Sequence, residues 1–160
     1  MSASGKTVSI NCFAAVSPLH DVGKIMIPDI VLLKPGKLDN YEWKVMKNHT
    51  LKGCDILDDT KHLWADEYYK LSYEICRYHH ERYDGSGYPD GLKGDEIPIS
   101  AQIVAVADAY DALLSERPYK KPFTHDEACK MILDGECGAF SPKIMKCFES
   151  VKDELRNAVN

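Results

Sequence analysis

Residues 79–89 have the sequence His-His-Glu-Arg-Tyr-Asp-Gly-Ser-Gly-Tyr-Pro, in which two imidazoles stand directly before a stretch rich in glycine. An adjacent His20-Asp21 pair precedes this stretch, and an isolated Asp108 follows it within an apolar helical run. Histidines and carboxylates distributed in this way indicate a metal site assembled from several helices. The site suits more than one ion, because a carboxylate can bridge two metals while each imidazole binds one. The chemistry predicted from this pattern is metal-assisted hydrolysis of a phosphate ester.

The composition predicts one globular domain. The chain has 160 residues, of which 44% are hydrophobic, so a single core of ordinary size accounts for all of it. Its formal net charge of −5 argues against non-specific binding to DNA or to an anionic membrane, and an anionic substrate would need local cations. No apolar run approaches the ~18 residues of a membrane helix, and no secretory signal is recognised, so we expect a cytoplasmic protein. The six cysteines form no Cys-x-x-Cys pair and are assigned no function.

The hydrophobic pattern predicts helices joined by loops and no pair of β-strands, which is an all-α fold. Asp39-Asn40-Tyr41-Glu42 has the form of a capping box, and we expect one helix from there to about Asp58 with His49 in its middle. A second helix is predicted from Ala65 to His80 by a repeating apolar face. Two of the candidate histidines therefore lie at a predicted helix end.

The second half of the chain begins with a predicted loop from Tyr83 to Gly94, because four glycines and a proline in this segment exclude a helix. Helix resumes after Pro98, and residues 103–114 are apolar around most of the circumference, as in a central core helix. Asp108 is the exception within that helix. Two further N-caps predict the remaining helices, from Thr124 to about Leu133 and from Ser141-Pro142 towards Leu155.

Each candidate ligand also has a purely structural interpretation. A mid-helix histidine such as His49 is more often hydrogen-bonded within the fold, and the same applies to His62 and His125. The His20-Asp21 pair fits a solvated helix end, and His79-His80 fits a solvated loop entrance. Asp108 differs, because burying a carboxylate without a partner costs several kcal/mol and a metal is an efficient partner. Taken together, the candidates favour a metal site.

Four motifs resemble those of the HD-GYP domain, a branch of the HD-type phosphohydrolases: His20-Asp21-Val22-Gly23-Lys24, His79-His80-Glu81-Arg82, Gly87-Tyr88-Pro89 and Arg117-Pro118-Tyr119. The resemblance covers about residues 13 to 150 and keeps the order of the motifs in the family. It implies an HD-type bundle of about five to seven helices with an ordered Gly-Tyr-Pro loop. The expected domain organisation is an N-terminal segment of uncertain order at residues 1–12 and an HD-GYP-like catalytic or binding domain at residues 13–158.

The resemblance implies a phosphodiesterase that hydrolyses the bacterial second messenger cyclic di-GMP to the linear dinucleotide or GMP. The implied ligands of two, or alternatively three, iron or manganese ions are His20, Asp21, His49, His79, His80 and Asp108, with Asp21 as the bridge. Such ions polarise the phosphodiester and lower the pKa of a shared water for in-line attack. The implied catalytic residues are Asp21 and Lys24. The implied substrate-binding residues are Lys24, Tyr88, Arg117 and Lys120, which offer an aromatic face to guanine and cations to phosphate.

The chain departs from the family pattern before His20. Members of the family have a further histidine ligand on an upstream helix, whereas residues 1–19 contain no His, Asp or Glu, and only Cys12, a soft donor, could replace it. We therefore expect impaired activity, and an apolar face that is exposed unless residues 6–18 or a partner chain covers it. We expect the chain to be a fragment, the product of an alternative start or a degenerate relative of the family. An upstream receiver or sensor domain is an expected partner.

Three classes of function remain open. The first, which we favour, is the cyclic di-GMP phosphodiesterase. The second is a catalytically weak or inactive module that binds cyclic di-GMP or a partner, which the missing upstream histidine favours. The third is an HD-type phosphohydrolase for another nucleotide, against which Gly87-Tyr88-Pro89 argues because that loop marks the cyclic-dinucleotide branch. Metal content and hydrolysis separate the first two classes, and substrate profiling separates the third.

Overall fold

The structure, a computed structural model, describes residues 9–116 and 121–158. Within these residues it contains helices and no β-strand, which confirms the predicted all-α bundle. None of the described helices is both long enough and apolar enough to cross a membrane. The α-helices are α1 (Ile10–Val16), α2 (Asp29–Leu32), α3 (Asn40–Lys47), α4 (His49–Asp59), α5 (Asp66–Tyr78), α6 (Ile99–Leu114), α7 (His125–Leu133) and α8 (Pro142–Ala158). The 3-10 helices are η1 (Ser17–Met26), η2 (Lys61–Leu63) and η3 (Gly94–Glu96).

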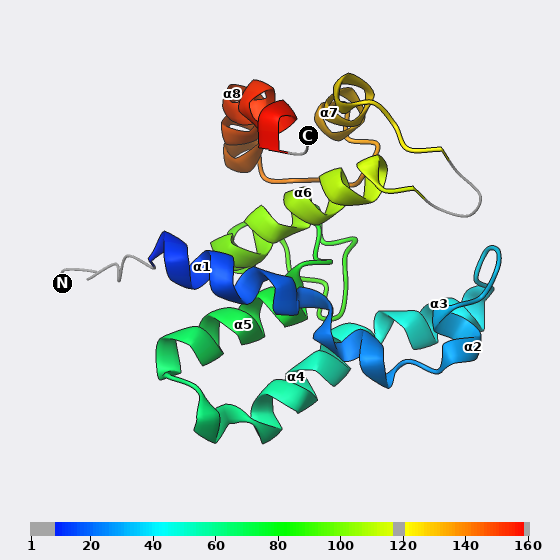
Figure 1. The fold of residues 1–160 in the computed structure, drawn as a ribbon, viewed down its shortest axis with the longest axis vertical. Helices are drawn as coiled ribbons and strands as arrows, with labels where there is room; N and C mark the ends of the chain where they lie inside the picture. Colours follow the sequence, from blue (N-terminus) through cyan, green and yellow to red (C-terminus); the bar gives the residue numbers. More distant parts are fainter. Residues whose placement is uncertain (1–8, 117–120, 159–160) are drawn as a thin grey trace.

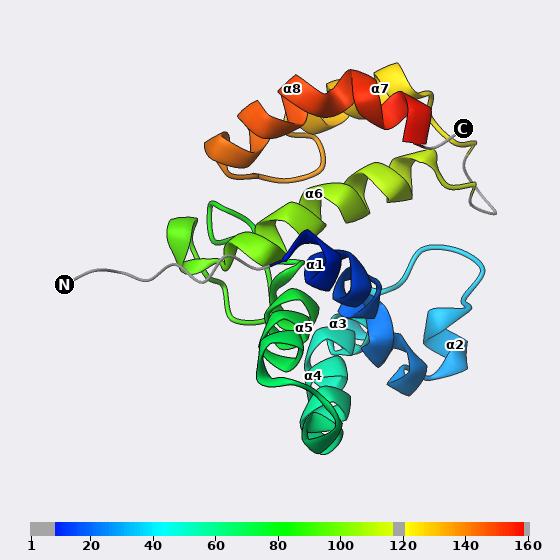
Figure 2. The ribbon, with the colours of Figure 1, turned by 60° about the vertical axis from the view of Figure 1, so that its left-hand side comes forward.

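Helix α6 lies at the centre of the fold, with α7 and α8 on one side and α1 and α5 on the other (Figures 1 and 2). Towards α7 and α8 it contributes Val106 and Tyr110 to a buried cluster with Ala128, Cys129, Ile132, Ile144 and Phe148. Towards α1 and α5 it contributes Val104 to a second cluster with Cys12, Val16, Leu71 and Ile75. This two-sided burial is the physical reason for the apolar pattern that the sequence shows around most of α6.

Helix α1 covers the apolar face of α5. Cys12 and Val16 are 2% and 1% exposed, and they pack against Leu71 and Ile75. The sequence analysis expected either residues 6–18 or a partner chain to cover this apolar face. In the structure α1, which lies within residues 6–18, covers it. Residues 10–12, which were expected within an N-terminal segment of uncertain order, belong to this helix. The domain boundaries themselves stay a prediction.

The predicted single helix over residues 39–58 is wrong, because the structure has two helices, α3 and α4, that meet at Asn48. The backbone N–H of Asn48 donates to the carbonyl of Val45, three residues back, at 3.1 Å, so the regular ladder of bonds to the fourth residue back is interrupted there. His49 is consequently the first residue of α4 rather than a mid-helix residue. No proline or glycine marks this break in the sequence.

Two of the predicted helix starts are confirmed by capping boxes. The Asp39 carboxylate accepts from the backbone N–H groups of Tyr41 and Glu42, and the Glu42 carboxylate accepts from the N–H of Asp39. Thr124 and Glu127 form the second capping box at the start of α7. Helix α5 ends at Tyr78, two residues before the predicted end, so His79 and His80 follow the helix.

Two glycines, Gly23 and Gly53, let η1 and α4 approach each other closely. A Cβ atom at Gly23 would lie 1.9 Å from the carbonyl oxygen of His49 and 2.4 Å from the backbone nitrogen of Gly53. A Cβ atom at Gly53 would lie 2.2 Å from Sγ of Cys76. The absence of both side chains therefore lets η1, which contains His20 and Asp21, lie against the start of α4.

We expect Gly23→Ala to destabilise the protein more than Gly53→Ala, because the first methyl group meets backbone and the second meets one sulfur atom. The expected loss in the free energy of unfolding for Gly23→Ala is about 3 kcal/mol or more. Adding Cys76→Ala should recover part of the Gly53→Ala loss and none of the Gly23→Ala loss. Urea denaturation of the two double-mutant cycles measures this coupling, and additive losses in the Gly53 cycle would contradict the packing described.

Candidate metal centre

The six side chains that the resemblance implies as ligands meet at one place. Elements η1, α4 and α6 contribute all but two of them, and the residues that follow α5 contribute the rest. Their donor atoms form two groups, and within each group the atoms lie within 4.8 Å of one another. The groups are Asp21, His49, His79 and His80, and His20, Asp21 and Asp108. Asp21 belongs to both, which is the position expected of a carboxylate between two ions.

Backbone carbonyls orient three of the histidines. The Nδ1 atom lies 2.8 Å from the Ser17 oxygen in His20, 2.8 Å from the Met46 oxygen in His49 and 3.0 Å from the Cys76 oxygen in His79. Because a carbonyl oxygen can only accept, each Nδ1 bears a proton and donates it. The opposite nitrogen, Nε2, is left to face Asp21. Metal-binding histidines commonly have this second hydrogen bond, which fixes the tautomer and the ring orientation.

The contact between His49 and His79 suits a cation. Their Nε2 atoms lie 3.4 Å apart, and since each ring already donates through Nδ1, a neutral pair has two lone pairs facing each other and no hydrogen bond. Burial lowers the pKa of both rings, and that of His79 falls to about 3, so neither ring takes up a proton at neutral pH. The two side chains are only 1% and 0% exposed, so their unpaired nitrogens are shielded from bulk solvent.

Asp21 has one carboxylate oxygen without a hydrogen-bond partner. This buried Oδ1 lies 3.3 Å from Nε2 of His49 and 3.8 Å from Nε2 of His79. The other oxygen, Oδ2, lies 3.3 Å from Nε2 of His20 and accepts from the Lys24 ammonium at 2.5 Å. Burial acts to raise the pKa of Asp21, but the contacts with His20 and Lys24 outweigh it and hold the pKa below its ordinary value. The residues present thus fit a cation on the Oδ1 side.

His20 and Asp108 face each other in the second group. Oδ1 of Asp108 lies 3.8 Å from Nε2 of His20. Burial raises the pKa of Asp108, with His20 and Lys24 counteracting it. Burial also acts to lower the pKa of His20, but Asp21 and Asp108 prevail and raise it. Both side chains therefore take up a proton more readily than usual, which suits the binding of a cation between them.

The predicted substrate-binding residues are only partly covered by the structure. Lys24 lies beside the cluster with its ammonium on Asp21, and Tyr88 stacks on His80 with ring centroids 4.8 Å apart and planes inclined by 27°. Burial raises the pKa of Tyr88, so its hydroxyl stays protonated and can donate. The positions of Arg117 and Lys120 lie outside the described residues.

Cys12 is not part of the cluster. It lies in the hydrophobic cluster between α1 and α5, and it belongs to neither group of donor atoms found among the described residues. Burial also raises the pKa of its thiol, which keeps it in the protonated form that binds metals poorly. The expectation that Cys12 replaces the upstream histidine therefore finds no support.

Glu81 has a role that the sequence analysis missed. Its carboxylate is 2% exposed and accepts three backbone N–H groups, those of Asp90 at 2.8 Å, Gly91 at 3.0 Å and Leu92 at 3.1 Å. Glu81 thereby fixes the loop that follows the two histidines. The available signal was a glycine-rich loop whose N–H groups need acceptors, directly after a carboxylate.

The Gly-Tyr-Pro loop folds back tightly on the end of α5. A Cβ atom at Gly87 would lie 2.4 Å from the backbone nitrogen of Arg82, so only glycine fits this position. The Arg77 guanidinium donates two hydrogen bonds of 2.9 Å to the carboxylate of Asp90 and thereby fixes the far end of the loop. These contacts hold Tyr88 against His80.

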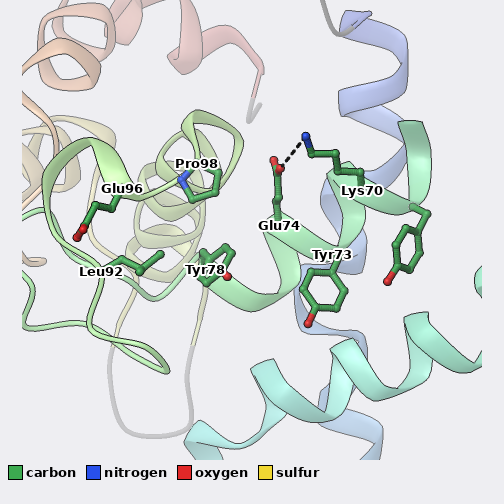
Figure 3. A pocket seen from close by; sticks show the side chains of 8 residues that line it. Lys70, Tyr73, Glu74, Tyr78, Leu92, Glu96 and Pro98 are labelled. Carbon is green, nitrogen blue, oxygen red and sulfur yellow. Dashed lines mark ion pairs between the residues drawn. The ribbon is translucent and has the colours of Figure 1, made fainter. Parts of the chain in front are cut away.

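The remaining histidines and a pocket along α5 lie apart from the cluster. Nδ1 of His125 lies 2.7 Å from the Tyr110 hydroxyl, which supports the structural interpretation of this histidine, and His62 is exposed in η2. Figure 3 shows a pocket of about 460 Å³ along α5, with the Lys70–Glu74 ion pair beside Tyr73. None of the six candidate ligands lines this pocket.

The helical bundle gathers four histidines and two aspartates in two groups around one shared carboxylate, an arrangement that fits a domain of the HD class. A family model described as HD domain matches residues 8–143, and the chain belongs to this family. The resemblance to the HD-GYP branch is confirmed by curated relatives that are named cyclic di-GMP phosphodiesterases.

Three relatives show the extent of the similarity. The cyclic di-GMP phosphodiesterase response regulator RpfG of Xanthomonas campestris pv. campestris is 50% identical over 127 residues, which are 79% of this chain and 32% of the relative. A cyclic di-GMP phosphodiesterase of Thermotoga maritima is 48% identical over 143 residues, 89% of this chain and 37% of the relative. The 3'3'-cGAMP-specific phosphodiesterase 2 of Vibrio cholerae is 44% identical over 139 residues, 87% of this chain and 26% of the relative. The chain thus spans about a third of the length of these relatives.

We expect Asp21→Asn to abolish the binding of both ions and Asp108→Asn to weaken one ion only, because Asp21 belongs to both donor groups and Asp108 to one. The expected loss in Mn²⁺ affinity at the Asp108 site is about tenfold or more. Elemental analysis after loading with Mn²⁺ and desalting, together with a Mn²⁺ titration, measures both effects.

The matched control is Asp111→Asn, an exposed aspartate one turn further along α6. It should leave the Mn²⁺ content and affinity unchanged. An Asp21→Asn variant that keeps two ions would show that Asp21 is not shared.

We expect Glu81→Gln to loosen the Gly-Tyr-Pro loop, because an amide cannot accept all three N–H bonds without turning its own N–H₂ towards one of them. The free energy of unfolding should fall by about 1–3 kcal/mol. Amide hydrogen exchange at Asp90, Gly91 and Leu92 should accelerate, while Glu154→Gln, which changes an exposed glutamate of α8, should alter neither quantity. Unchanged exchange at the three amides would exclude the role given to Glu81.

Proposed function

We propose that the chain is a metal-dependent phosphodiesterase that hydrolyses cyclic di-GMP to the linear dinucleotide or GMP in bacterial second-messenger signalling. The observation that supports it most directly is the pair of donor groups that share Asp21, since a shared carboxylate suits the two-ion hydrolysis of phosphate esters. The relatives named as cyclic di-GMP phosphodiesterases support the choice of substrate.

The proposed metal centre uses only nitrogen and oxygen donors. His49, His79 and His80 would hold one ion with Asp21, and His20 and Asp108 would hold a second ion with the same carboxylate. Imidazole and carboxylate together suit iron and manganese, which are the metals we propose. Two divalent ions account for the two groups, and a third ion remains the alternative predicted from the resemblance.

When bound, the ions would polarise the phosphodiester and acidify a water molecule for in-line attack. The residues of the chain prepare the site for this step. Asp21 holds both halves of the centre together, and Lys24 places an ammonium beside it that can neutralise a phosphate oxygen. Tyr88 offers a protonated hydroxyl next to His80. Arg117 and Lys120 would contact the phosphates according to the resemblance alone.

A related cyclic dinucleotide is the second candidate substrate, because three relatives from Vibrio cholerae are named 3'3'-cGAMP-specific phosphodiesterases. The alternative of a catalytically weak or inactive binding module gains no support from the names of the relatives. The cytoplasmic location and the upstream domain or partner chain stay predictions from the sequence.

We expect the protein, purified without oxygen and loaded with Fe²⁺ or Mn²⁺, to convert cyclic di-GMP to the linear dinucleotide or GMP. Chelation should abolish this activity, and reloading should restore it. Chromatography of the products from cyclic di-GMP and 3'3'-cGAMP, run in parallel, ranks the two substrates by kcat/KM.

The Asp21→Asn variant is the matched negative control, because it keeps the shape of the side chain and removes the shared charge. Binding of cyclic di-GMP without turnover by the fully loaded protein would favour the binding module instead. Faster turnover of 3'3'-cGAMP would assign the second candidate substrate.

A further inference from the structure

Helix α3 adjoins the candidate metal centre, because its Met46 carbonyl accepts from Nδ1 of His49. None of its residues is buried, and Trp43 is 47% exposed. The indole of Trp43 therefore lies at the surface. An exposed indole next to an active site needs an explanation, because tryptophan contributes strongly to recognition of flat aromatic ligands.

A chain of ring contacts joins Trp43 to the metal centre. Tyr88 stacks on His80, and the ammonium of Lys47 lies over the Tyr88 ring, 5.0 Å from its centroid. The same ammonium lies 5.8 Å from the centroid of Trp43. Lys47 is therefore located between two aromatic rings, one of which touches a candidate metal ligand.

The ammonium of Lys47 has rings as neighbours rather than a carboxylate. Within the described part of the chain, the ion pairs of Lys24 and Lys34 go to Asp21 and Glu42, whereas Lys47 has no such partner. Its charge is consequently available to an anion. His80 covers one face of Tyr88 and Lys47 lies over the ring, so a purine that stacked there would have to displace the ammonium.

The position of α3 is fixed by contacts on both of its ends. Its first turn is capped by Asp39, and the Glu42 carboxylate also accepts from Lys34 at 2.7 Å. Near its last turn, the Met46 carbonyl accepts from Nδ1 of His49 at 2.8 Å. The helix that presents Trp43 and Lys47 thus also orients a candidate metal ligand.

We propose that Trp43 and Lys47 form a substrate-binding surface on α3, on which the indole stacks against a purine base and the ammonium binds a phosphate oxygen of the cyclic dinucleotide. This inference rests on the proposed function and adds the residues that select a dinucleotide over a smaller phosphodiester. A base–aromatic stack supplies affinity that does not depend on the metals, and an ammonium beside it binds the anionic backbone. It also supplies a local cation of the kind that the net charge of −5 requires for an anionic substrate.

The first test compares Lys47→Gln and Trp43→Ala with Lys44→Gln in the Mn²⁺-loaded protein. Lys44 is exposed and also lies in the last turn of α3, so its variant matches the loss of one charge from the helix end. Each of the first two variants should raise KM for cyclic di-GMP about tenfold, with kcat and Mn²⁺ content little changed. Lys44→Gln should leave KM unchanged.

The second test observes Trp43 directly. The chain has two tryptophans, so Trp64→Phe leaves Trp43 as the only indole fluorophore. The substitution removes one hydrogen bond, which Nε1 of Trp64 donates to the Thr60 hydroxyl at 3.2 Å. Stopped-flow mixing with cyclic di-GMP should quench its fluorescence within the first turnover, whereas inorganic phosphate should not. Adding Lys47→Gln should shift the quenching to about tenfold higher nucleotide concentrations.

The outcomes separate the two proposals. If the wild type hydrolyses cyclic di-GMP while both variants keep its KM and Trp43 is not quenched, the substrate surface on α3 is overturned and the proposed function stands. If the loaded wild type does not hydrolyse cyclic di-GMP, the proposed function is overturned. Loss of Mn²⁺ in the Lys47→Gln variant would also overturn the inference, because it would assign the residue to the metal centre.

Discussion

The candidate metal centre depends on the Asp21 carboxylate, around which buried hydrogen-bond acceptors outnumber donors. Oδ1 of Asp21 and the Nε2 atoms of His49 and His79 lie within 3.3 to 3.8 Å of one another, and none of them has a proton to share. An unsatisfied buried acceptor costs ~1–3 kcal/mol, and burial keeps both imidazoles neutral. A divalent cation removes all of these costs at once, so the same burial that destabilises the free cluster favours metal binding.

The fold assembles this cluster by using helix ends. The last turn of a helix leaves carbonyl oxygens without partners, and here such carbonyls accept the Nδ1 protons of histidines: Met46 at the end of α3 and Cys76 at the end of α5. The Gly23–Gly53 contact then lets η1 approach α4 until Asp21 reaches those rings. The helix ends and the glycine contact therefore act together, since neither would place Asp21 between the two histidines alone.

Helix periodicity and caps are local signals, and they predicted the all-α class and most helix limits. The six clustered side chains were implied as a set by the resemblance to the HD-GYP domain. The sequence analysis failed where the signal is not local. The break at Asn48 consists of one shifted hydrogen bond, and no glycine or proline announces it. The role of Glu81 depends on N–H groups nine to eleven residues away that the loop brings back.

The two lysines beside the centre differ in availability, and this difference links metal binding to substrate binding. Nζ of Lys24 lies 2.5 Å from Oδ2 of Asp21, so the charge of the lysine is paired with this carboxylate as long as no other cation binds Asp21. Lys47 has only aromatic rings beside its ammonium. Under the proposed function, divalent ions at Asp21 would weaken its attraction for Lys24, and the ammonium would then be free to bind a phosphate oxygen. The centre would thus reach its full affinity for an anionic diester only once the metal-holding residues had bound their ions.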